Sequence, residues 1–408
     1  MRIKDIGNIN ARVLREDTPQ DYTFQYIDIS SVSSDGQISL SEPMRYDESP
    51  SRARRIVKKD DVIVSTVRTY LRAIAGIDWD AKDTIASTGF AVISPDKKKD
   101  PAYVKYLMSS DAVVDEICKE STGVSYPAIS SSRLSAIQIP VVSLKEQKTI
   151  SAYLDKQINS INERIWLRER ELQTLIKLKQ SEINSVVTRS LDSTVPMKDS
   201  GIPWIGQIPE SWELKRVKDL CDFVSRGCTP DYVDDESAYM VMNQATFSKG
   251  YVDYSGVRYS SYCKKEAKIN KGDLLIASTG GGVLGKVLLF TEDCEQFYAD
   301  THVTIVRSSS TPIIAKFLYY YFSTRFEMIN ALMAKGSTNQ TELQRDELLS
   351  HFVPAPDIKE MEAICEHLDD RMTHFSSLIA NINAQIDKLK LLKKALINEV
   401  ITGQRPIV

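Results

Sequence analysis

Residues 144–190 read LKEQKTISAYLDKQINSINERIWLRERELQTLIKLKQSEINSVVTRS, and a related stretch begins at Ile358. That second stretch reads IKEMEAICEHLDDRMTHFSSLIANINAQIDKLKLLKKALINEVITGQ. A shift of 214 positions superimposes Leu154-Asp155 on Leu368-Asp369, with almost no gaps between the two copies. The chain is therefore built around an internal repeat, and each copy contains one long segment without an internal proline or glycine.

Both segments carry mostly apolar residues at alternating spacings of four and three, which is typical of a coiled coil. In the first copy these seam positions are Leu154, Ile158, Ile161, Ile165, Arg168, Leu172, Leu175, Lys179, Glu182 and Val186. In the second copy they are Leu368, Met372, Phe375, Ile379, Ile382, Ile386, Leu389, Lys393, Leu396 and Val400. A helix of about 45 residues spans roughly 65–70 Å, so the pattern predicts two helices that cover each other's apolar stripe. The alternative is one surface helix per domain, packed only on its own globule.

The repeat extends beyond the helices. RIKDI at residues 2–6 matches RVKDL at 216–220, and further matched segments follow in the same order in both halves. These segments predict strands within 58–66 and 85–93 and their counterparts 269–279 and 298–306, then helical stretches, then polar loops at 121–134 and 336–348. We therefore predict an α+β protein with two similar domains and two long antiparallel helices. The predicted segments are domain 1 at 1–143, helix 1 at 144–190, a linker at 191–213, domain 2 at 214–357 and helix 2 at 358–402.

Composition excludes several protein classes. The 408 residues contain six cysteines without a CxxC pair, which is typical of buried thiols in a reducing compartment. We found no apolar run of the length of a membrane span and no signal-peptide core, so we expect a soluble cytoplasmic protein. The net charge of −3 argues against an overall basic protein but is compatible with a local basic patch.

Motifs for catalysis are incomplete. GGGVLGK at 280–286 has the spacing of a phosphate-binding loop, but Val287 replaces the magnesium-binding Ser or Thr. Pro230-Asp231 with Glu266-Ala267-Lys268 is similar to a metal-dependent nuclease motif, but the first half lacks it. His367 and His374 share a helical face, where a solvated surface is the simpler interpretation. The sequence therefore offers no convincing catalytic group or metal site.

Basic, aromatic and amide side chains gather instead in matching parts of both halves. Arginine and lysine neutralise phosphates and read guanine, while asparagine and glutamine pair with adenine. The same residues would also suit a solvated surface. The candidate DNA-binding residues of the first half are Arg52, Arg54, Arg55, Lys58, Thr66, Arg68, Tyr70, Arg72, Ser125 and Tyr126. Those of the second half are Asn243, Gln244, Lys271, Thr279, Lys286, His302, Thr338, Asn339 and Gln340.

Several of these segments resemble one protein family. MKDSGIPWIGQIPESWELKRVKDL at 197–220, IASTGGGVLGKV at 276–287, GSTNQTEL at 336–343 and ALINEVITGQ at 395–404 are similar to the DNA-specificity subunit of type I restriction–modification systems. The resemblance covers both halves. The first half departs from the family pattern, because its loop after Ser65-Thr66 has no glycine and TGVSYPAIS replaces the usual polar loop.

The resemblance implies two target-recognition domains and no catalysis by this chain. It also implies assembly with two modification subunits that methylate adenine with S-adenosylmethionine, and with restriction subunits that use ATP and Mg²⁺ to translocate and cleave DNA. Antiparallel helices would relate the two halves by a pseudo-two-fold axis, so we expect two half-sites separated by unread base pairs. The alternatives are a fused methyltransferase or nuclease, which cofactor binding by the isolated chain would reveal, and a scaffold that binds protein only and shows no salt-sensitive DNA binding.

Overall fold

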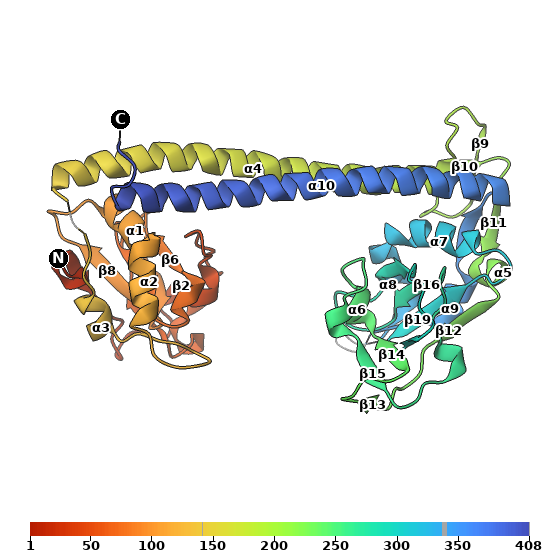
Figure 1. Ribbon diagram of the computed structural model, residues 1–408, viewed down its shortest axis with the longest axis horizontal. Coiled ribbons are helices and arrows are strands. Elements are labelled where there is room, and N and C mark those ends of the chain that lie inside the picture. The colour runs from red at the N-terminus through yellow and green to blue at the C-terminus, as the bar shows by residue number, and fades with distance from the viewer. Residues whose placement is uncertain (141, 337–340, 408) are drawn as a thin grey trace. The chain divides into compact units, whose positions relative to one another are not determined.

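The computed structural model describes residues 1–140, 142–336 and 341–407 and divides into two compact units (Figure 1). Unit 1 contains Met1–Glu171 and Ile382–Val408, and unit 2 contains Leu172–Asn381. The two long helices are α4 (Leu144–Arg189) and α10 (Ile358–Ile401). Each unit therefore includes part of both helices, whereas the sequence assigned each helix to a separate segment.

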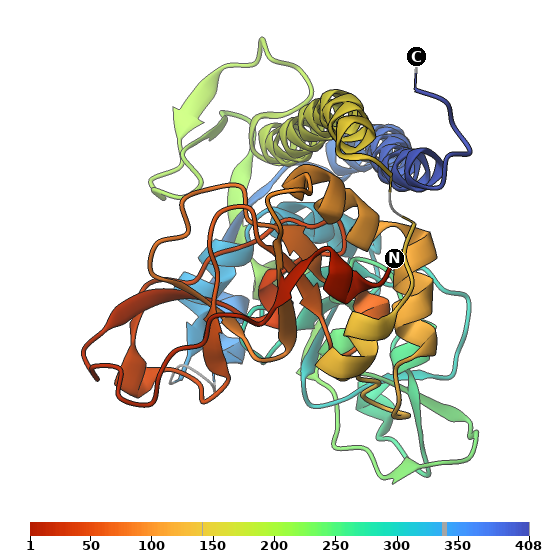
Figure 2. The same cartoon turned by 90° about the vertical axis from the view of Figure 1, so that its left-hand side faces the viewer.

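The predicted helical seam is buried within each unit. In unit 1 the beginning of α4 packs against the end of α10, so the two segments are antiparallel and lie side by side (Figures 1 and 2). In unit 2 the end of α4 packs against the beginning of α10 in the same sense. There the Arg371 guanidinium donates to the Glu182 carboxylate across the seam at 2.9 Å. This hydrogen bond and charge pairing lower the pKa of Glu182 despite its partial burial.

Unit 1 contains two four-stranded sheets that pack face to face. The first has the order β1-β8-β5-β6 and is antiparallel throughout, and the second has the order β3-β2-β7-β4 with β2 and β7 parallel. The strands of the first sheet are β1 (Gly7–Ile9), β8 (Phe90–Pro95), β5 (Val62–Ser65) and β6 (Ile74–Gly76). Those of the second are β3 (Met44–Arg45), β2 (Thr23–Ile27), β7 (Thr84–Ser87) and β4 (Ala53–Ile56).

The strand β5 is central to unit 1 because both of its faces are covered. Side chains alternate along a strand, so Val62 and Val64 face the helices, while Ile63 faces the second sheet. The helices on this side are α1 (Pro101–Ser109) and α2 (Asp111–Lys119), and they cover the sheet together with α4 and α10. Burial on both faces explains the continuous apolar run of β5.

Unit 2 repeats this architecture. Its first sheet, β12-β19-β16-β17, corresponds strand by strand to that of unit 1, and its second has the order β13-β15-β14-β18 with β14 and β18 parallel. The strands are β12 (Phe223–Arg226), β19 (Val303–Arg307), β16 (Leu274–Ala277), β17 (Val287–Leu289), β13 (Tyr232–Val233), β15 (Arg258–Ser260), β14 (Tyr239–Met242) and β18 (Phe297–Ala299). The helices are α5 (Val217–Leu220), α6 (Gln244–Phe247), α7 (Ile313–Ser323), α8 (Phe326–Met333) and α9 (Arg345–Ser350).

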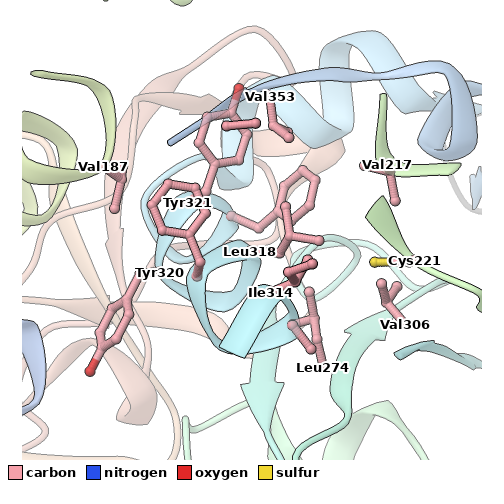
Figure 3. Close-up of a cluster of buried hydrophobic side chains, with 14 of the residues drawn as sticks. Val187, Val217, Cys221, Leu274, Val306, Ile314, Leu318, Tyr320, Tyr321 and Val353 are labelled. Atoms are coloured by element: carbon pink, nitrogen blue, oxygen red, sulfur yellow. The ribbon is translucent and has the colours of Figure 1, made fainter. Parts of the chain in front are cut away.

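The main core of unit 2 surrounds α7. Figure 3 shows Ile314, Leu318 and Tyr321 of this helix among side chains from several other elements, including Leu274 of β16. The same cluster includes Val187 of α4 and Leu368 of α10, so the long helices contribute to the core of the globule.

One polar contact joins the globule to its long helix in both units. The Tyr106 hydroxyl of α1 donates to the Asp155 carboxylate at 2.7 Å, and the Tyr320 hydroxyl of α7 donates to Asp369 at 2.6 Å. The shift of 214 residues relates one tyrosine–aspartate pair to the other. Burial, together with the neighbouring carboxylate, raises the pKa of each tyrosine. The sequence repeat is therefore also a repeat of specific side-chain contacts.

The structure corrects three predicted elements. The segment 85–93 is not one strand, because the chain crosses from β7 to β8 at Thr88-Gly89 and so enters the other sheet, and 298–306 divides in the same way. Each helical stretch is broken into two helices, at Ser110 and near Thr324.

The predicted linker is the third correction, because it packs on unit 2 and contains the hairpin β9 (Met197–Asp199) and β10 (Gln207–Pro209). Trp212 is 1% exposed, and its indole donates to Glu360 at 2.8 Å. Trp204 stacks on His351 with ring centroids 6.1 Å apart. After the hairpin, β11 (Glu213–Arg216) pairs with β22 (Phe352–Ala355). Both tryptophans therefore anchor this segment within unit 2.

Candidate nucleic-acid interface

In unit 1 the loop that follows the central strand β5 is joined to the polar loop at 121–134. The Ile129 amide donates to the Thr66 carbonyl at 2.8 Å, and the Arg68 amide donates to the Pro127 carbonyl at 2.7 Å. The hydroxyls of Thr69 and Ser121 are 2.9 Å apart. Two predicted recognition segments that are distant in sequence therefore form one surface.

Two arginines give the loop after β5 its shape. Arg68 and Arg72 flank the short 3₁₀ helix η4 (Thr69–Leu71) and have φ values of 49° and 59°. The left-handed conformation costs a non-glycine residue roughly 1–2 kcal/mol. This loop lacks the glycines of the family pattern, and two strained arginines adopt the left-handed conformation instead. Neighbouring residues hold the side chains of both arginines. Backbone strain of this kind often marks a functional site.

The Arg68 side chain stays at the surface of this loop. Its guanidinium lies over the Tyr126 ring, 4.3 Å from the centroid, in a cation–π contact. Tyr126 is 63% exposed, and Ser125 and Tyr70 are exposed as well. Arg68 therefore presents a planar, preorganised set of donors of the kind that reads a guanine edge.

Arg72 has a different environment from Arg68. Its Nη2 lies 2.5 Å from the Asp111 carboxylate and donates to the Ser109 carbonyl at 3.2 Å. This predicted DNA-binding arginine is therefore paired within the protein.

The arginines near β4 are also placed in different settings. The Arg52 side chain is exposed, and the Arg52 carbonyl accepts a hydrogen bond from the Thr88 amide at 2.8 Å. Arg52 therefore lies beside the segment where the chain crosses from β7 to β8, and this segment also contacts Thr66. Arg54 stacks on the Tyr46 ring at 5.1 Å and donates to its hydroxyl at 2.8 Å. Burial lowers the pKa of Arg55. Arg52 is thus the member of this run that is both exposed and adjacent to the loop surface.

Two predicted lysines lie at the other end of the central strands. Lys58 is in the turn that precedes β5, and Lys271 is in the equivalent turn before β16, where it pairs with Asp293 at 3.5 Å. Thr66 and Thr279 instead follow the carboxyl ends of these strands. The structure therefore does not bring the two lysines together with the loop residues.

Unit 2 forms the same junction with different side chains. Thr279 bridges to Glu342, and the Leu343 amide donates to the Ser278 carbonyl at 2.8 Å. Arg226 was not among the predicted residues, yet its guanidinium contacts both loops. It pairs with Glu342 at 3.0 Å and donates to the Leu343 carbonyl at 2.9 Å and to the Ser278 carbonyl at 3.5 Å. The equivalent residue in the first half of the sequence is Arg12, which pairs with Asp61 instead. A comparison of the two halves therefore could not reveal the role of Arg226.

Glycines shape the loop after β16. Gly280, Gly282 and Gly285 have φ values of 91°, 82° and 89°, which glycine adopts without strain. The Gln244 side chain lies next to this loop. Its amide nitrogen is so close to Gly280 that a Cβ atom at that position would be only 3.6 Å from it. Within the described residues, the buried Gln244 Oε1 has no hydrogen-bond partner. An amide at the junction with unused acceptor capacity is suited to pairing with a base.

The remaining predicted residues of unit 2 surround this loop. His302 is exposed, its Nδ1 is 2.7 Å from the Thr279 hydroxyl, and its amide donates to the Asp300 carboxylate at 2.8 Å. Burial raises the pKa of Asp300. Asn243 uses its side-chain oxygen to cap α6, and Lys286 is partly exposed where the loop re-enters the sheet. Thr338, Asn339 and Gln340 lie outside the described residues.

Within residues 1–140, 142–336 and 341–407, no group of three or more His, Cys, Asp or Glu side chains is arranged to hold a metal ion. None of the helices described there combines the length and apolar character needed to cross a membrane.

Comparison with known proteins identifies the family. The model of the type I restriction modification DNA specificity domain matches residues 1–167 and 209–388. A putative type I restriction enzyme MjaX specificity subunit of Methanocaldococcus jannaschii is 26% identical over 205 residues, which are 48% of this chain and 47% of the relative. The match thus spans about half the length of that relative. The MjaVIII specificity subunit of the same organism is 22% identical over 335 residues, covering 79% of this chain and 74% of the relative.

A solved structure shares this fold. A chain from a study of complex assembly and conformational transition in the type I R-M system superimposes with a TM-score of 0.71 at 21% identity. The superposition covers 98% of this chain and 96% of the other. Because the family model matches both halves of the sequence, the chain belongs to the family of type I restriction–modification DNA specificity domains.

Proposed function

We propose that this chain binds a bipartite duplex DNA site as the specificity subunit of a type I restriction–modification complex. The observation that carries the proposal is the repeated junction between the loop after the central strand and the polar loop, with different side chains in each unit. Arg68 with Tyr126 in unit 1 and Gln244 with His302 in unit 2 are suited to different base edges. Each unit then reads its own half-site.

The chain itself is proposed to supply recognition and no chemistry. Modification subunits would methylate adenine with S-adenosylmethionine, and restriction subunits would translocate and cleave DNA with ATP and Mg²⁺. The relatives named above are specificity subunits, which supports this division of labour. The purified chain incubated with duplex DNA and S-adenosylmethionine is expected to transfer no methyl group until modification subunits are added.

The proposal is tested by mapping methylated adenines in a host genome with and without this gene. We expect a bipartite motif that disappears when the gene is deleted. In a second arm, residues 1–143 are exchanged for those of a relative, with residues 214–357 exchanged as the matched control. Each exchange should alter a different half of the motif. A change in both halves after either exchange would contradict separate reading by the two units.

A further inference from the structure

Asp111 lies where three parts of unit 1 meet. It is the first residue of α2, and its Oδ1 is 2.5 Å from Arg72 Nη2 in the loop after β5 and 3.2 Å from Lys394 Nζ of α10. The Asp111 carboxylate therefore links the loop that follows the central strand to a helix from the opposite end of the chain.

The two ion pairs of Asp111 differ in shielding. The Arg72 side chain is 20% exposed and that of Lys394 is 51% exposed, against 31% for Asp111. Solvent screens the lysine contact more strongly, so the Arg72–Asp111 pair is the stronger of the two. Arg72 also donates to the Ser109 carbonyl, which holds its side chain against the junction of α1 and α2.

The backbone of Arg72 needs this support. Its φ of 59° ends the 3₁₀ turn in a left-handed conformation, and the preceding left-handed residue, Arg68, is the one stacked on Tyr126. A strained loop keeps one conformation only where its surroundings over-determine it. The ion pair of Arg72 with Asp111, together with the hydrogen bond from Arg72 to the Ser109 carbonyl, holds one side of this loop.

We infer that Arg72 is a positioning residue, held by Asp111 with support from Lys394, and that it keeps Arg68 and Tyr126 in the geometry that reads the half-site of unit 1. This inference rests on the proposed function and adds an assignment to it. Arg72 is then not a DNA contact, although its residue type and place in the sequence indicated one.

The two roles predict opposite results for Asp111→Asn. If Arg72 is a positioning residue, losing the carboxylate loosens the loop and lowers base discrimination at one half-site. If Arg72 contacts phosphate, losing the carboxylate frees the guanidinium, so all duplexes bind more tightly and the salt dependence becomes steeper by about 0.9 in log–log slope.

The experiment uses the full-length chain assembled with the modification subunits of its own system. The probe is the duplex that the wild-type complex enriches from a randomised pool, together with variants carrying one changed base pair in either half-site. Affinity is measured at several KCl concentrations. For Asp111→Asn we expect discrimination to fall about tenfold at one half-site, as when one good base contact is lost. The other half-site and the salt slope should not change.

Three further variants complete the test. Asp111→Glu keeps the carboxylate and should retain discrimination. Lys394→Met should show a smaller loss than Asp111→Asn, whereas Lys388→Met, at an exposed lysine of the same helix, should behave as wild type. Should Asp111→Asn fail to fold by thermal melting, Arg72→Met decides the question. Positioning predicts an unchanged salt slope, and a phosphate contact predicts a slope lower by about 0.9.

Unchanged discrimination in a folded Asp111→Asn complex, or tighter binding to all duplexes, would overturn the inference while leaving the proposed function intact. A wild-type complex that enriches no sequence from the pool would overturn the proposed function itself.

Discussion

At the scale of single residues, His351 makes unit 2 sensitive to pH. Burial lowers its pKa to about 4, with a further contribution from the Arg325 charge, and it lies between Trp204 and Tyr321. Because the folded-state pKa is below the ordinary value of 6.5, this residue's stabilising contribution is complete above pH 6.5 and is lost as pH falls toward 4.

We expect His351 to lower the free energy of unfolding of unit 2 by about 2 kcal/mol between pH 7 and pH 5. Urea unfolding followed by tryptophan fluorescence measures this change. The His351→Gln variant cannot titrate, so its pH dependence over the same range should be smaller by that amount. Equal pH dependence in both proteins would show that His351 does not bind a proton on unfolding.

Arg68 and Lys58 test how basic residues divide their roles in DNA binding. Arg68→Ala removes the guanidinium that stacks on Tyr126, and we expect a loss of about 1–3 kcal/mol of base discrimination at one half-site. Lys58 lies at the other end of β5, away from the loop residues, so Lys58→Ala should change neither base discrimination nor the salt slope. Titrations with matched and single-mismatch duplexes separate the two results, and a uniform loss for Arg68→Ala would contradict base reading.

At the scale of secondary-structure elements, the seam of the long helices carries much of their stability. Leu368 of α10 is fully buried in the core of unit 2, whereas Leu378 of the same helix is 37% exposed. Leu368→Ala is expected to cost about 2–5 kcal/mol because it leaves a cavity. Leu378→Ala makes the same chemical change outside the seam and should cost well under that. Chemical denaturation of both variants compares them directly, and equal losses would mean that the seam is not the main packing surface.

At the scale of the whole molecule, we expect the length of the long helices to affect the spacing of the two half-sites. Four residues inserted near the middle of α4 lengthen it by about 6 Å, and each base pair adds about 3.4 Å. The insertion shifts the seam by four positions, which locally unwinds rather than breaks the packing. The unchanged partner helix limits the extension, so the unread spacer should grow by one base pair, or two at most, with both half-sites unchanged. Methylation mapping of a folded insertion mutant measures this, and an unchanged spacer would show that the helices do not determine the gap.

Much of the fold was predictable because its signals are local and repeated. The spacing of apolar residues from Leu154 to Val186 depends only on helical geometry, and the structure buries or half-buries every seam position. The strands predicted within 58–66 and 269–279 are likewise confirmed by β5 and β16. The breaks at Thr88-Gly89 and Ser110 were missed, because a run of suitable residues does not reveal where the chain passes to another sheet or helix.

The candidate site was only partly predictable from sequence. Residue type and repeat position selected Thr66, Arg68 and Tyr126, which the structure brings together in one loop junction. The same criteria selected Arg72, whose charge is paired with Asp111, 39 positions away, and they overlooked Arg226. The sequence by itself therefore determined the repeat, the long helices and the central strands, since these follow from periodic patterns of apolar residues. Only the tertiary structure decided which arginines face solvent and which are held by carboxylates, because ion pairing and burial depend on contacts between residues that are distant along the chain.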